Sequence, residues 1–220
     1  SFAAFLLDKD ADPNAHGAGY TALHAAVLRG DLDLVKALVA HGANPNARLE
    51  NGTPLRREGP DYALPESLVG ATAFLLAAKF ADVEMMRVLS TGGADVKLAA
   101  KDGTTPLVAA VNSERRQGGN YGGMVAEDSP SPEAVKLVLD LGCDVNAADE
   151  AGNTALHLAA SRGYITAVQL LVDRGAKLDV KNKRGVTPLG ITQARRGRNQ
   201  EVQLRLKSTA DLLRKLGAAE

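Results

Sequence analysis

The sequence contains no tryptophan, and aromatic residues make up only 4% of its 220 residues. The apolar content comes mostly from alanine, leucine and valine, and a hydrophobic fraction of 45% is sufficient for a packed core. Small aliphatic side chains favour many short helices that pack closely. They are poorly suited to a large pocket lined with aromatic rings.

Cysteine and long apolar runs are also scarce. The single cysteine, Cys143, excludes an intramolecular disulfide framework. No apolar run approaches the roughly 20 residues that a membrane-spanning helix needs, and no signal peptide is visible. The chain begins in the middle of a structural unit, so an upstream leader could have been removed. The compartment is therefore left open, with the cytoplasm as the default and an exported location as the alternative.

Charge of one sign does not dominate the chain, whose net charge is zero. This total excludes a global field that would select nucleic acid or an anionic membrane. Residues 1–173 nevertheless hold 14 basic and 22 acidic residues, whereas residues 174–220 hold 12 basic and 4 acidic residues. The basic end is either a docking surface or a solvated capping helix. Because it has no aromatic residues to stack on bases, it is not expected to bind nucleic acid.

The sequence does contain an internal repeat. The segment 19–26, GYTALHAA, returns at 152–160 as GNTALHLAA, and looser copies begin at Thr72, Thr105 and Thr187. Counted from Thr21, the threonines are spaced by 51, 33, 49 and 33 residues, so the longer intervals equal 33 plus 18 and 33 plus 16. Such a period is the signature of a repeat protein in which each unit stacks on its neighbours.

A second landmark, a glycine that opens a short turn, follows each of the first four copies. It reads GANPN from Gly42, GADV from Gly93, GCDVN from Gly142 and GAKL from Gly175. The two landmarks together resemble the ankyrin repeat, with its Thr-Pro-Leu-His start, paired helices and Gly-Ala-Asp end. The resemblance covers nearly the whole chain. It departs from the family pattern where histidine is replaced, at Leu75, Val108 and Gly190.

The resemblance implies an all-α fold, an ankyrin-repeat solenoid of stacked helix-turn-helix pairs joined by β-hairpin fingers. Residues 1–220 are expected to form one such domain. Its parts are a half repeat at 1–15 and repeats at about 16–48, 66–100, 101–148, 149–181 and 182–220. Asp10 occupies the glycine position of the half repeat, and residues 206–216 are expected to form a final helix that Gly217 closes.

Local signals support these elements independently of the family. Thr21 and Thr154 are good N-caps, and Pro106 and Pro188 occupy the first helical position, where proline is tolerated. Paired alanines let neighbouring helices approach closely. The recurring glycines stand where a helix ends in a left-handed residue.

Two long insertions interrupt the period. The first, at about 49–69, lies in the hairpin between two repeats and contains the turn signal Asn51-Gly52, which predicts an elongated finger. The second, at about 114–132, lies between the helices of one repeat. It is rich in glycine and Ser-Pro, which predicts a mobile loop. Loops of this length are usually functional or disordered.

Catalytic motifs are missing: the sequence has no Walker A motif, no His-Glu-x-x-His and no Gly-x-Ser-x-Gly. His24 and His157 occupy one repeat position three repeats apart, too far to share a metal or a substrate. The resemblance implies that each ring bonds the capping threonine and the neighbouring hairpin backbone. Cys143 is interpreted as a small buried filler. Asp31 and Asp82 lie near second-helix N-termini, where they favour the helix dipole.

The function expected from these features is binding of a protein partner by a monomer, with no catalysis, cofactor, metal, nucleic acid or membrane segment. Ankyrin stacks usually bind partners along a concave face of finger tips and first helices. The corresponding residues, with three from the long finger, are Tyr20, Leu28, Arg29, Arg56, Arg57, Tyr62, Lys79, Phe80, Asn112, Ser113, Asn153, Ser161 and Arg162.

Three alternatives stay open at this point. Phe80 and Leu28 either anchor a partner or pack under the long finger. The chain as a whole could instead be a non-catalytic regulatory or targeting part of a larger enzyme. It could also bind a small molecule between the finger and the concave face.

Overall fold

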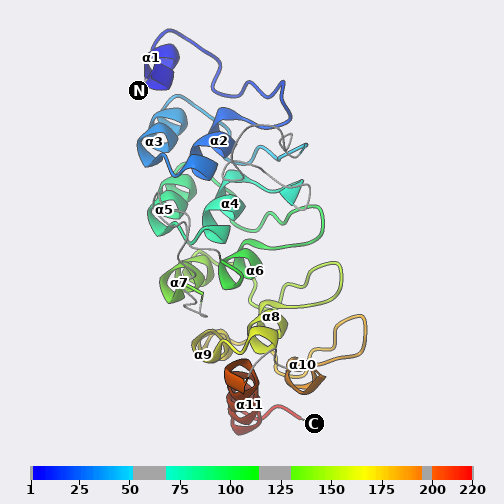
Figure 1. Ribbon diagram of the computed structural model, residues 1–220. Coiled ribbons are helices and arrows are strands. Elements are labelled where there is room, and N and C mark those ends of the chain that lie inside the picture. Colours follow the sequence, from blue (N-terminus) through cyan, green and yellow to red (C-terminus); the bar gives the residue numbers. More distant parts are fainter. Residues whose placement is uncertain (1, 52–67, 114–129, 195–199, 220) are drawn as a thin grey trace. The chain divides into compact units, whose positions relative to one another are not determined.

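The computed structural model describes residues 2–51, 68–113, 130–194 and 200–219. These segments form short helices joined by turns and loops (Figure 1), and their only β pairing is an isolated antiparallel bridge between Ala148 and Thr154. The predicted all-α class is therefore confirmed. None of the described helices is long and apolar enough to cross a membrane. The helices are α1 (Phe2–Leu7), α2 (Ala22–Arg29), α3 (Leu32–Ala40), α4 (Ala73–Lys79), α5 (Val83–Thr91), α6 (Pro106–Val111), α7 (Pro132–Asp140), α8 (Ala155–Arg162), α9 (Ile165–Asp173), α10 (Pro188–Ala194) and α11 (Gln200–Lys215).

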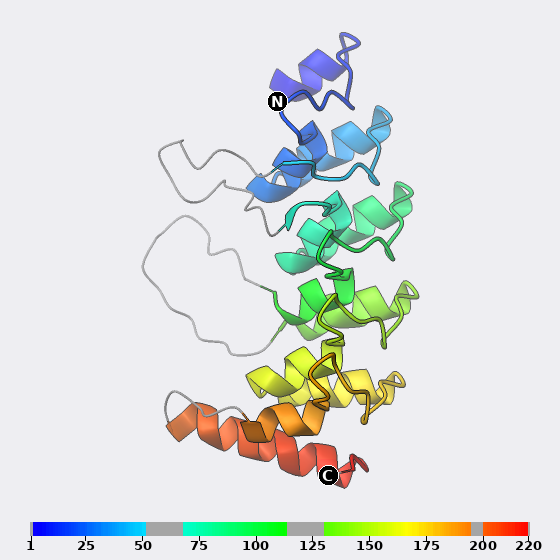
Figure 2. The ribbon, with the colours of Figure 1, turned by 90° about the vertical axis from the view of Figure 1, so that its right-hand side faces the viewer.

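The chain divides into two compact units, residues 1–106 and residues 107–220. In unit 1, helices α1, α3 and α5 pack in one row and α2 packs on α4 in a second row (Figure 1). In unit 2, α7, α9 and α11 pack in succession, and α8 packs on α10. Figure 2 shows α11, which is 16 residues long, lying beside α10. That all 220 residues form one domain stays a prediction.

The helices begin at the residues that the local signals predicted. The hydroxyl of Thr21 accepts the His24 N–H at 3.4 Å, and Pro106 and Pro188 are the first residues of their helices. Asp31 and Asp82 do more than favour the helix dipole, because each carboxylate accepts a backbone N–H of the first turn, at 3.0 and 3.2 Å respectively. Side-chain acceptors of this kind satisfy N–H groups that have no partner within the helix.

The core is built from small and aliphatic side chains. Every residue of α4 from Ala73 to Ala78 is at most 1% exposed, and the paired alanines Ala159 and Ala160 of α8 are fully buried. Alanine adds little bulk, so neighbouring helix pairs pack at close range. This packing buries one face of each pair that the pair could not bury by itself.

Left-handed residues end the second helices, as the repeat predicted. Gly42, Gly93, Gly142 and Gly175 have φ between +82° and +90°. Asp10, which occupies the same repeat position in the half repeat, also has a positive φ of 62°. The glycine pattern therefore marks the conformation that the chain adopts even where another residue replaces glycine.

Asparagine side chains join successive hairpins within each unit. Asn14 donates to the carbonyl of Gly42 at 3.1 Å and accepts the N–H of Asn44 at 2.6 Å. Asn46 makes the same pair of bonds to Gly93 and Asp95 in unit 1, and Asn146 makes it to Gly175 and Lys177 in unit 2. We refer to these three pairs of bonds as the amide bridges. Each needs both a donor and an acceptor, which an asparagine amide supplies.

The first insertion leaves and rejoins the fold at a closed base. The Leu49 N–H donates to the Ala71 carbonyl at 2.9 Å, and the Gly70 N–H donates to the Leu49 carbonyl at 2.7 Å. The predicted finger turn at Asn51-Gly52 and most of the finger lie outside the described residues, because the structure describes nothing from 52 to 67. The same holds for residues 114–129 of the second insertion, whose predicted end at 132 already belongs to α7.

Candidate functional site

The two histidines of the repeat join each first helix to the following hairpin. In unit 1 the Nδ1 of His24 lies 2.8 Å from the Thr21 hydroxyl, and its Nε2 lies 3.3 Å from the Ala71 carbonyl. In unit 2 the Nδ1 of His157 lies 2.9 Å from the Thr154 hydroxyl, and its Nε2 lies 3.1 Å from the carbonyl of Val186. The structural role implied by the resemblance is confirmed.

These bonds assign the protonation state of both rings. A carbonyl oxygen can only accept, so Nε2 carries the proton, and Nδ1 accepts from the threonine hydroxyl and from the threonine backbone N–H. Burial lowers the pKa of His24 and of His157 below 6.5, although the hydrogen bonds that the rings donate to carbonyl oxygens act in the opposite direction. Both rings are therefore neutral near pH 7, and neither has a free nitrogen for a metal or a substrate.

Two neighbouring loops of unit 2 are fixed to each other by a chain of hydrogen bonds between side chains. The Asn182 amide donates to the Asn153 Oδ1 at 2.9 Å, and the Asn153 amide donates to the Asp149 carboxylate at 3.3 Å. The backbone also contributes, because the Lys183 N–H donates to the Ala151 carbonyl at 2.9 Å. A Cβ at Gly152 would lie 2.9 Å from the Lys183 nitrogen, so this approach requires glycine.

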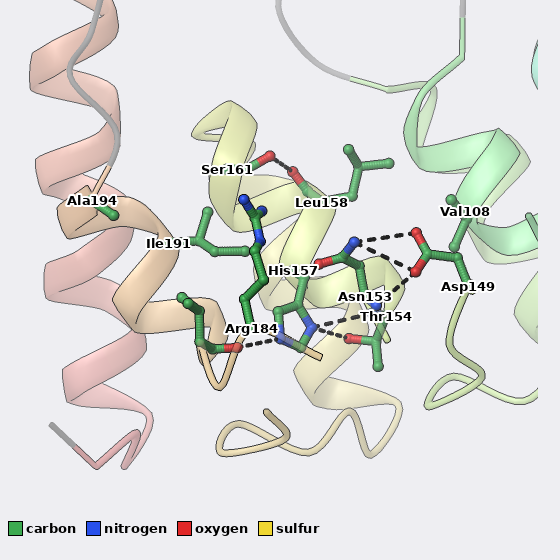
Figure 3. A pocket seen from close by; sticks show the side chains of 11 residues that line it. Val108, Asp149, Asn153, Thr154, His157, Leu158, Ser161, Arg184, Ile191 and Ala194 are labelled. Atoms are coloured by element: carbon green, nitrogen blue, oxygen red, sulfur yellow. Dashed lines mark hydrogen bonds between the residues drawn. The ribbon is translucent and has the colours of Figure 1, made fainter. Parts of the chain in front are cut away.

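A pocket of about 460 Å³ lies between these loops and the helices α8 and α10 (Figure 3). Five of its eleven lining residues are aliphatic, and the other six are polar or charged residues of the two loops and of α8. The lining residues are Val108, Asp149, Asn153, Thr154, His157, Leu158, Ser161, Arg184, Val186, Ile191 and Ala194. All of them belong to unit 2.

Most polar groups in the pocket already bond within the protein. The Ser161 hydroxyl donates to the Leu158 carbonyl at 2.9 Å. Both ring nitrogens of His157 are engaged, and both oxygens of Asp149 accept from Asn153. Within the described residues, no group of three or more histidines, cysteines or acidic residues could hold a metal ion. The pocket thus offers shape, an aliphatic wall and fixed polar groups rather than reactive ones.

Arg184 is the exception among the polar lining residues. Its guanidinium forms no ion pair or hydrogen bond with any residue in the described part of the chain. In Figure 3 its side chain runs beside Ile191 and α8. An arginine that is exposed and without a partner retains five donors for a ligand.

The pocket brings together some of the residues that the repeat register predicted for the binding face. Asn153 and Ser161 line it. Arg162 donates to the Asn112 side-chain oxygen at 3.1 Å, and the half-buried Ser113 follows directly in the chain. Asn153, Ser161 and Arg162 belong to one repeat, and Asn112 and Ser113 belong to the repeat before it, so the bond between Arg162 and Asn112 joins two repeats.

The other residues predicted for the binding face belong to unit 1, and none of those that the structure describes lines this pocket. Tyr20, Leu28, Lys79 and Phe80 are half-buried, and Arg29 is exposed. Their role in binding stays a prediction. Arg56, Arg57 and Tyr62 of the finger lie outside the described residues. Arg48, at the base of the finger, donates to the carbonyls of Gly70 and Ala99 at 3.0 and 2.7 Å, so its guanidinium holds the repeat together.

Sequence reasoning missed several residues of the pocket. Val186 and Ala194 stand at the repeat positions of Tyr20 and Leu28, so extending the same register into the last repeat would have found them. Leu158 and Ile191 also share one repeat position. Arg184 has no such signal, because the corresponding residue of the preceding repeat is an alanine, Ala151.

Comparison with known proteins agrees with this repeated geometry. A model of three ankyrin repeat copies matches residues 124–215, and a model of a single ankyrin repeat matches residues 18–49. The chain belongs to the ankyrin repeat family. The threonine, histidine and glycine positions described above are thus ankyrin repeat positions, and all the lining residues of the pocket except Val108 lie within residues 124–215.

Other ankyrin repeat proteins are similar over most of this chain. It is 30% identical to the B-cell lymphoma 3 protein homolog of Mus musculus over 196 residues, which cover 80% of the chain and 40% of that protein. It is 30% identical to ankyrin repeat and SOCS box protein 16 of Homo sapiens over 207 residues, or 85% and 43% of the two proteins. It is 28% identical to the E3 ubiquitin-protein ligase KEG of Arabidopsis thaliana over 179 residues, or 80% and 9%. The chain spans less than half the length of each of these relatives.

Proposed function

We propose that the chain is a protein-interaction module, which binds a segment of a protein partner and catalyses no reaction itself. Ankyrin repeats generally mediate protein–protein interaction, and the chain has their fold. The observation that carries the proposal is the pocket of unit 2, because it is concave, lined by both aliphatic and polar side chains, and bordered by loops that are fixed to each other. Preformed sites of this kind bind with little loss of conformational entropy.

The bonds within the pocket support binding without catalysis. A serine nucleophile needs a base that accepts its proton. Ser161 instead donates to a backbone carbonyl, and the Nδ1 of His157 is occupied by Thr154. The carboxylate of Asp149 is held by the loop that it closes. The same groups are well placed to fix the orientation of a bound peptide.

The proposed binding face also includes residues of unit 1. Tyr20, Leu28, Arg29, Lys79 and Phe80 stand at the repeat positions that correspond to the pocket residues or directly beside them. Large apolar residues at such positions often anchor interfaces. We assign the finger residues 56, 57 and 62 to the same face on the basis of the sequence alone.

A second candidate function is the binding of a small molecule. The pocket volume of about 460 Å³ favours it, since small-molecule sites commonly measure about 300–1,000 Å³. A third possibility is that the module is part of a larger enzyme whose catalytic domain lies elsewhere in the protein. One relative of this chain is named as an E3 ubiquitin-protein ligase. In that case the module would target a larger enzyme to its partner.

Filling the pocket tests the proposed function directly. The variant Ala194→Trp places an indole at an exposed residue that lines the pocket. The matched control Ile165→Trp changes an apolar residue that is 41% exposed on α9 and does not line it. Each tagged chain is used to capture proteins from its own host, followed by quantitative mass spectrometry. A partner retained by the wild type and the control should be lost from Ala194→Trp.

Two further measurements make the result decisive. Melting curves of both variants check that the fold is intact, so a lost partner can be attributed to the pocket. The partner is then purified and its affinity is measured by titration calorimetry. Equal binding to both variants would place the site away from the pocket, and a partner that needs a co-purified small molecule would favour the second candidate.

A further inference from the structure

Arg184 lines the pocket of unit 2, and two further cations, Lys181 and Lys183, precede it closely in the chain. Lys181, Lys183 and Arg184 are all exposed, and none forms an ion pair with a residue that the structure describes. Arg174, near the start of the same basic region, instead bonds Asp140 at 2.8 Å. We refer to residues 177–186, which also include Lys177 and Asp179, as the cationic hairpin.

The cationic hairpin is held in place by the loop beside it. The side chain of Asn182 is 5% exposed, and its oxygen accepts the N–H groups of Arg184 and Val186 at 3.0 and 3.1 Å. Its amide donates to Asn153, a residue that lines the pocket. Arg184 is therefore attached to a fixed turn at the pocket wall rather than to a free loop.

The rest of the pocket wall selects a different chemistry. Val108, Leu158 and Ile191 provide aliphatic surface, and none of the lining residues is Phe, Tyr or Trp. Asp149 lies on the opposite side of His157 from Arg184 in Figure 3, where three N–H donors of its own loop already bond its carboxylate. An occupant that fits both features must combine an aliphatic group with an anion.

We propose that the pocket binds an acidic peptide segment of the partner, with an aliphatic side chain against Leu158 and Ile191 and a carboxylate paired with Arg184. This inference rests on the proposed function and specifies its partner chemistry. A guanidinium pairs with a carboxylate through two parallel hydrogen bonds, which gives direction as well as strength. Lys181 and Lys183 add a field that attracts further acidic residues and speeds association.

A peptide fits these observations better than a nucleic acid does. Single-stranded nucleic acids usually bind through stacking on aromatic rings combined with a basic track. The pocket has no Phe, Tyr or Trp, and the imidazole of His157 is buried and bonded through both nitrogens. Its aliphatic wall has no complement on a phosphate backbone. The cations alone would attract either polymer, so the experiment includes both.

The test begins with a random dodecapeptide display library selected on the full chain. Enriched peptides are synthesised with a fluorescein label, and their affinity is measured by fluorescence anisotropy for the wild type, Arg184→Gln and Arg174→Gln. The last variant is matched, because it removes the same charge from the same unit away from the pocket. We expect Asp or Glu next to Leu, Ile or Val in the enriched peptides. Arg184→Gln should weaken binding about tenfold or more, as expected for a charge-assisted bond.

A second comparison locates the carboxylate. Each acidic residue of the best peptide is replaced in turn by its amide, Asn or Gln. For one of them, the replacement should weaken binding to the wild type and leave binding to Arg184→Gln unchanged. Binding should also weaken as salt is raised from 0.05 to 0.5 M, because the paired charges are exposed.

The outcomes separate the inference from the proposed function. Enriched peptides that are not acidic, or that bind Arg184→Gln and Arg174→Gln equally, would overturn the inference and leave the interaction module standing. Labelled oligo-dT that binds more tightly than the peptides and depends on Arg184 would replace the peptide with a nucleic acid. No enrichment of any peptide, together with equal partner capture by Ala194→Trp and the wild type, would count against both.

Discussion

Ala81 has a backbone conformation that its side chain disfavours. It lies in the turn between α4 and α5 with a φ of 52°, whereas the residues at the same repeat position are Gly30 and Gly163, with φ of 73° and 74°. A left-handed conformation destabilises the folded state by about 1–2 kcal/mol for a residue with a Cβ. Glycine avoids this strain, but relative to alanine it lowers stability by about 0.5–1 kcal/mol because its unfolded state has more conformational entropy. The first effect is the larger one.

We predict that Ala81→Gly raises the free energy of unfolding by about 0.5–1 kcal/mol, measured by urea denaturation. The reciprocal change Gly30→Ala should lower it by about 1 kcal/mol. A loss of stability in Ala81→Gly would mean that contacts of the Ala81 methyl group outweigh the strain of the backbone.

His157 should make stability depend on pH. Above pH 6.5 its ring is neutral in both the folded and the unfolded chain, so its contribution is complete. Burial lowers the pKa in the folded state, so on acidification the unfolded chain binds the proton first. The free energy of unfolding therefore falls as the pH decreases from 6.5 through the lowered pKa of the folded ring.

The variant His157→Ala tests this linkage. At pH 7.5 it should lose about 1–3 kcal/mol of stability, because the Thr154 hydroxyl and the Val186 carbonyl lose their buried partner. The difference between the wild type and the variant should shrink as the pH is lowered from 7 to 5. A difference that stays constant, measured by denaturant titration at each pH, would contradict the neutral buried ring.

At the scale of the element, the amide bridges join hairpins that are far apart in sequence. Asn46 bonds Gly93 and Asp95. The equivalent residue after α9 is Asp179, which accepts the Ala219 N–H at 3.0 Å but has no side-chain N–H group to donate. The same repeat position therefore forms both hydrogen bonds where it is asparagine, and only the accepted one where it is aspartate.

We predict that Asn46→Ala lowers the free energy of unfolding by about 1–2 kcal/mol, since each hydrogen bond contributes roughly 0.5–1.5 kcal/mol. Asn46→Asp keeps the acceptor for Asp95 and should lose less. Thermal melting of the two variants at pH 7 distinguishes these values. Equal melting temperatures for Asn46→Ala and the wild type would show that water replaces the bridge without loss.

The helix ends could be predicted from the sequence wherever the signal is local. Threonine, proline and glycine act on the backbone within one turn, so the starts of α2 and α10 and the left-handed residue at Gly42 were predicted correctly. The last helix was predicted from Leu206, yet α11 begins at Gln200. Its first turn is mostly polar and exposed, and Leu204, just beyond that turn, is 63% exposed, so the buried apolar period starts later than the helix does.

At the scale of the whole molecule, the candidate site was only partly predictable. The register places Asn153 and Ser161 on a common face because helical repeats recur in space as they do in sequence. Whether Arg184 finds a carboxylate depends on residues from other loops, which no local pattern encodes. The same applies to the bond between Arg162 and Asn112, whose positions are 50 residues apart.

The finger provides the last prediction. If residues 48–69 and Phe80 contribute to the binding face, Phe80→Ala or a finger trimmed to normal length should weaken partner binding by about 1 kcal/mol or more. Phe5→Ala is the control, because Phe5 is 54% exposed on α1. Titration calorimetry with a captured partner measures the affinities. Unchanged affinity in both Phe80→Ala and the trimmed variant would leave the pocket of unit 2 as the candidate site.

The bonds between repeats also determine where such a chain can gain length. Residues 52–67 depart after Leu49 has bonded Ala71, and residues 114–129 follow α6, where Val108 replaces the bridging histidine. A segment added at either place leaves the described bonds between neighbouring hairpins intact. Closing a longer loop costs little additional conformational entropy, about 0.6 kcal/mol for each doubling of the loop length. Over evolutionary time, an ankyrin array of this kind can therefore acquire new surface at these two points while its repeats keep their register.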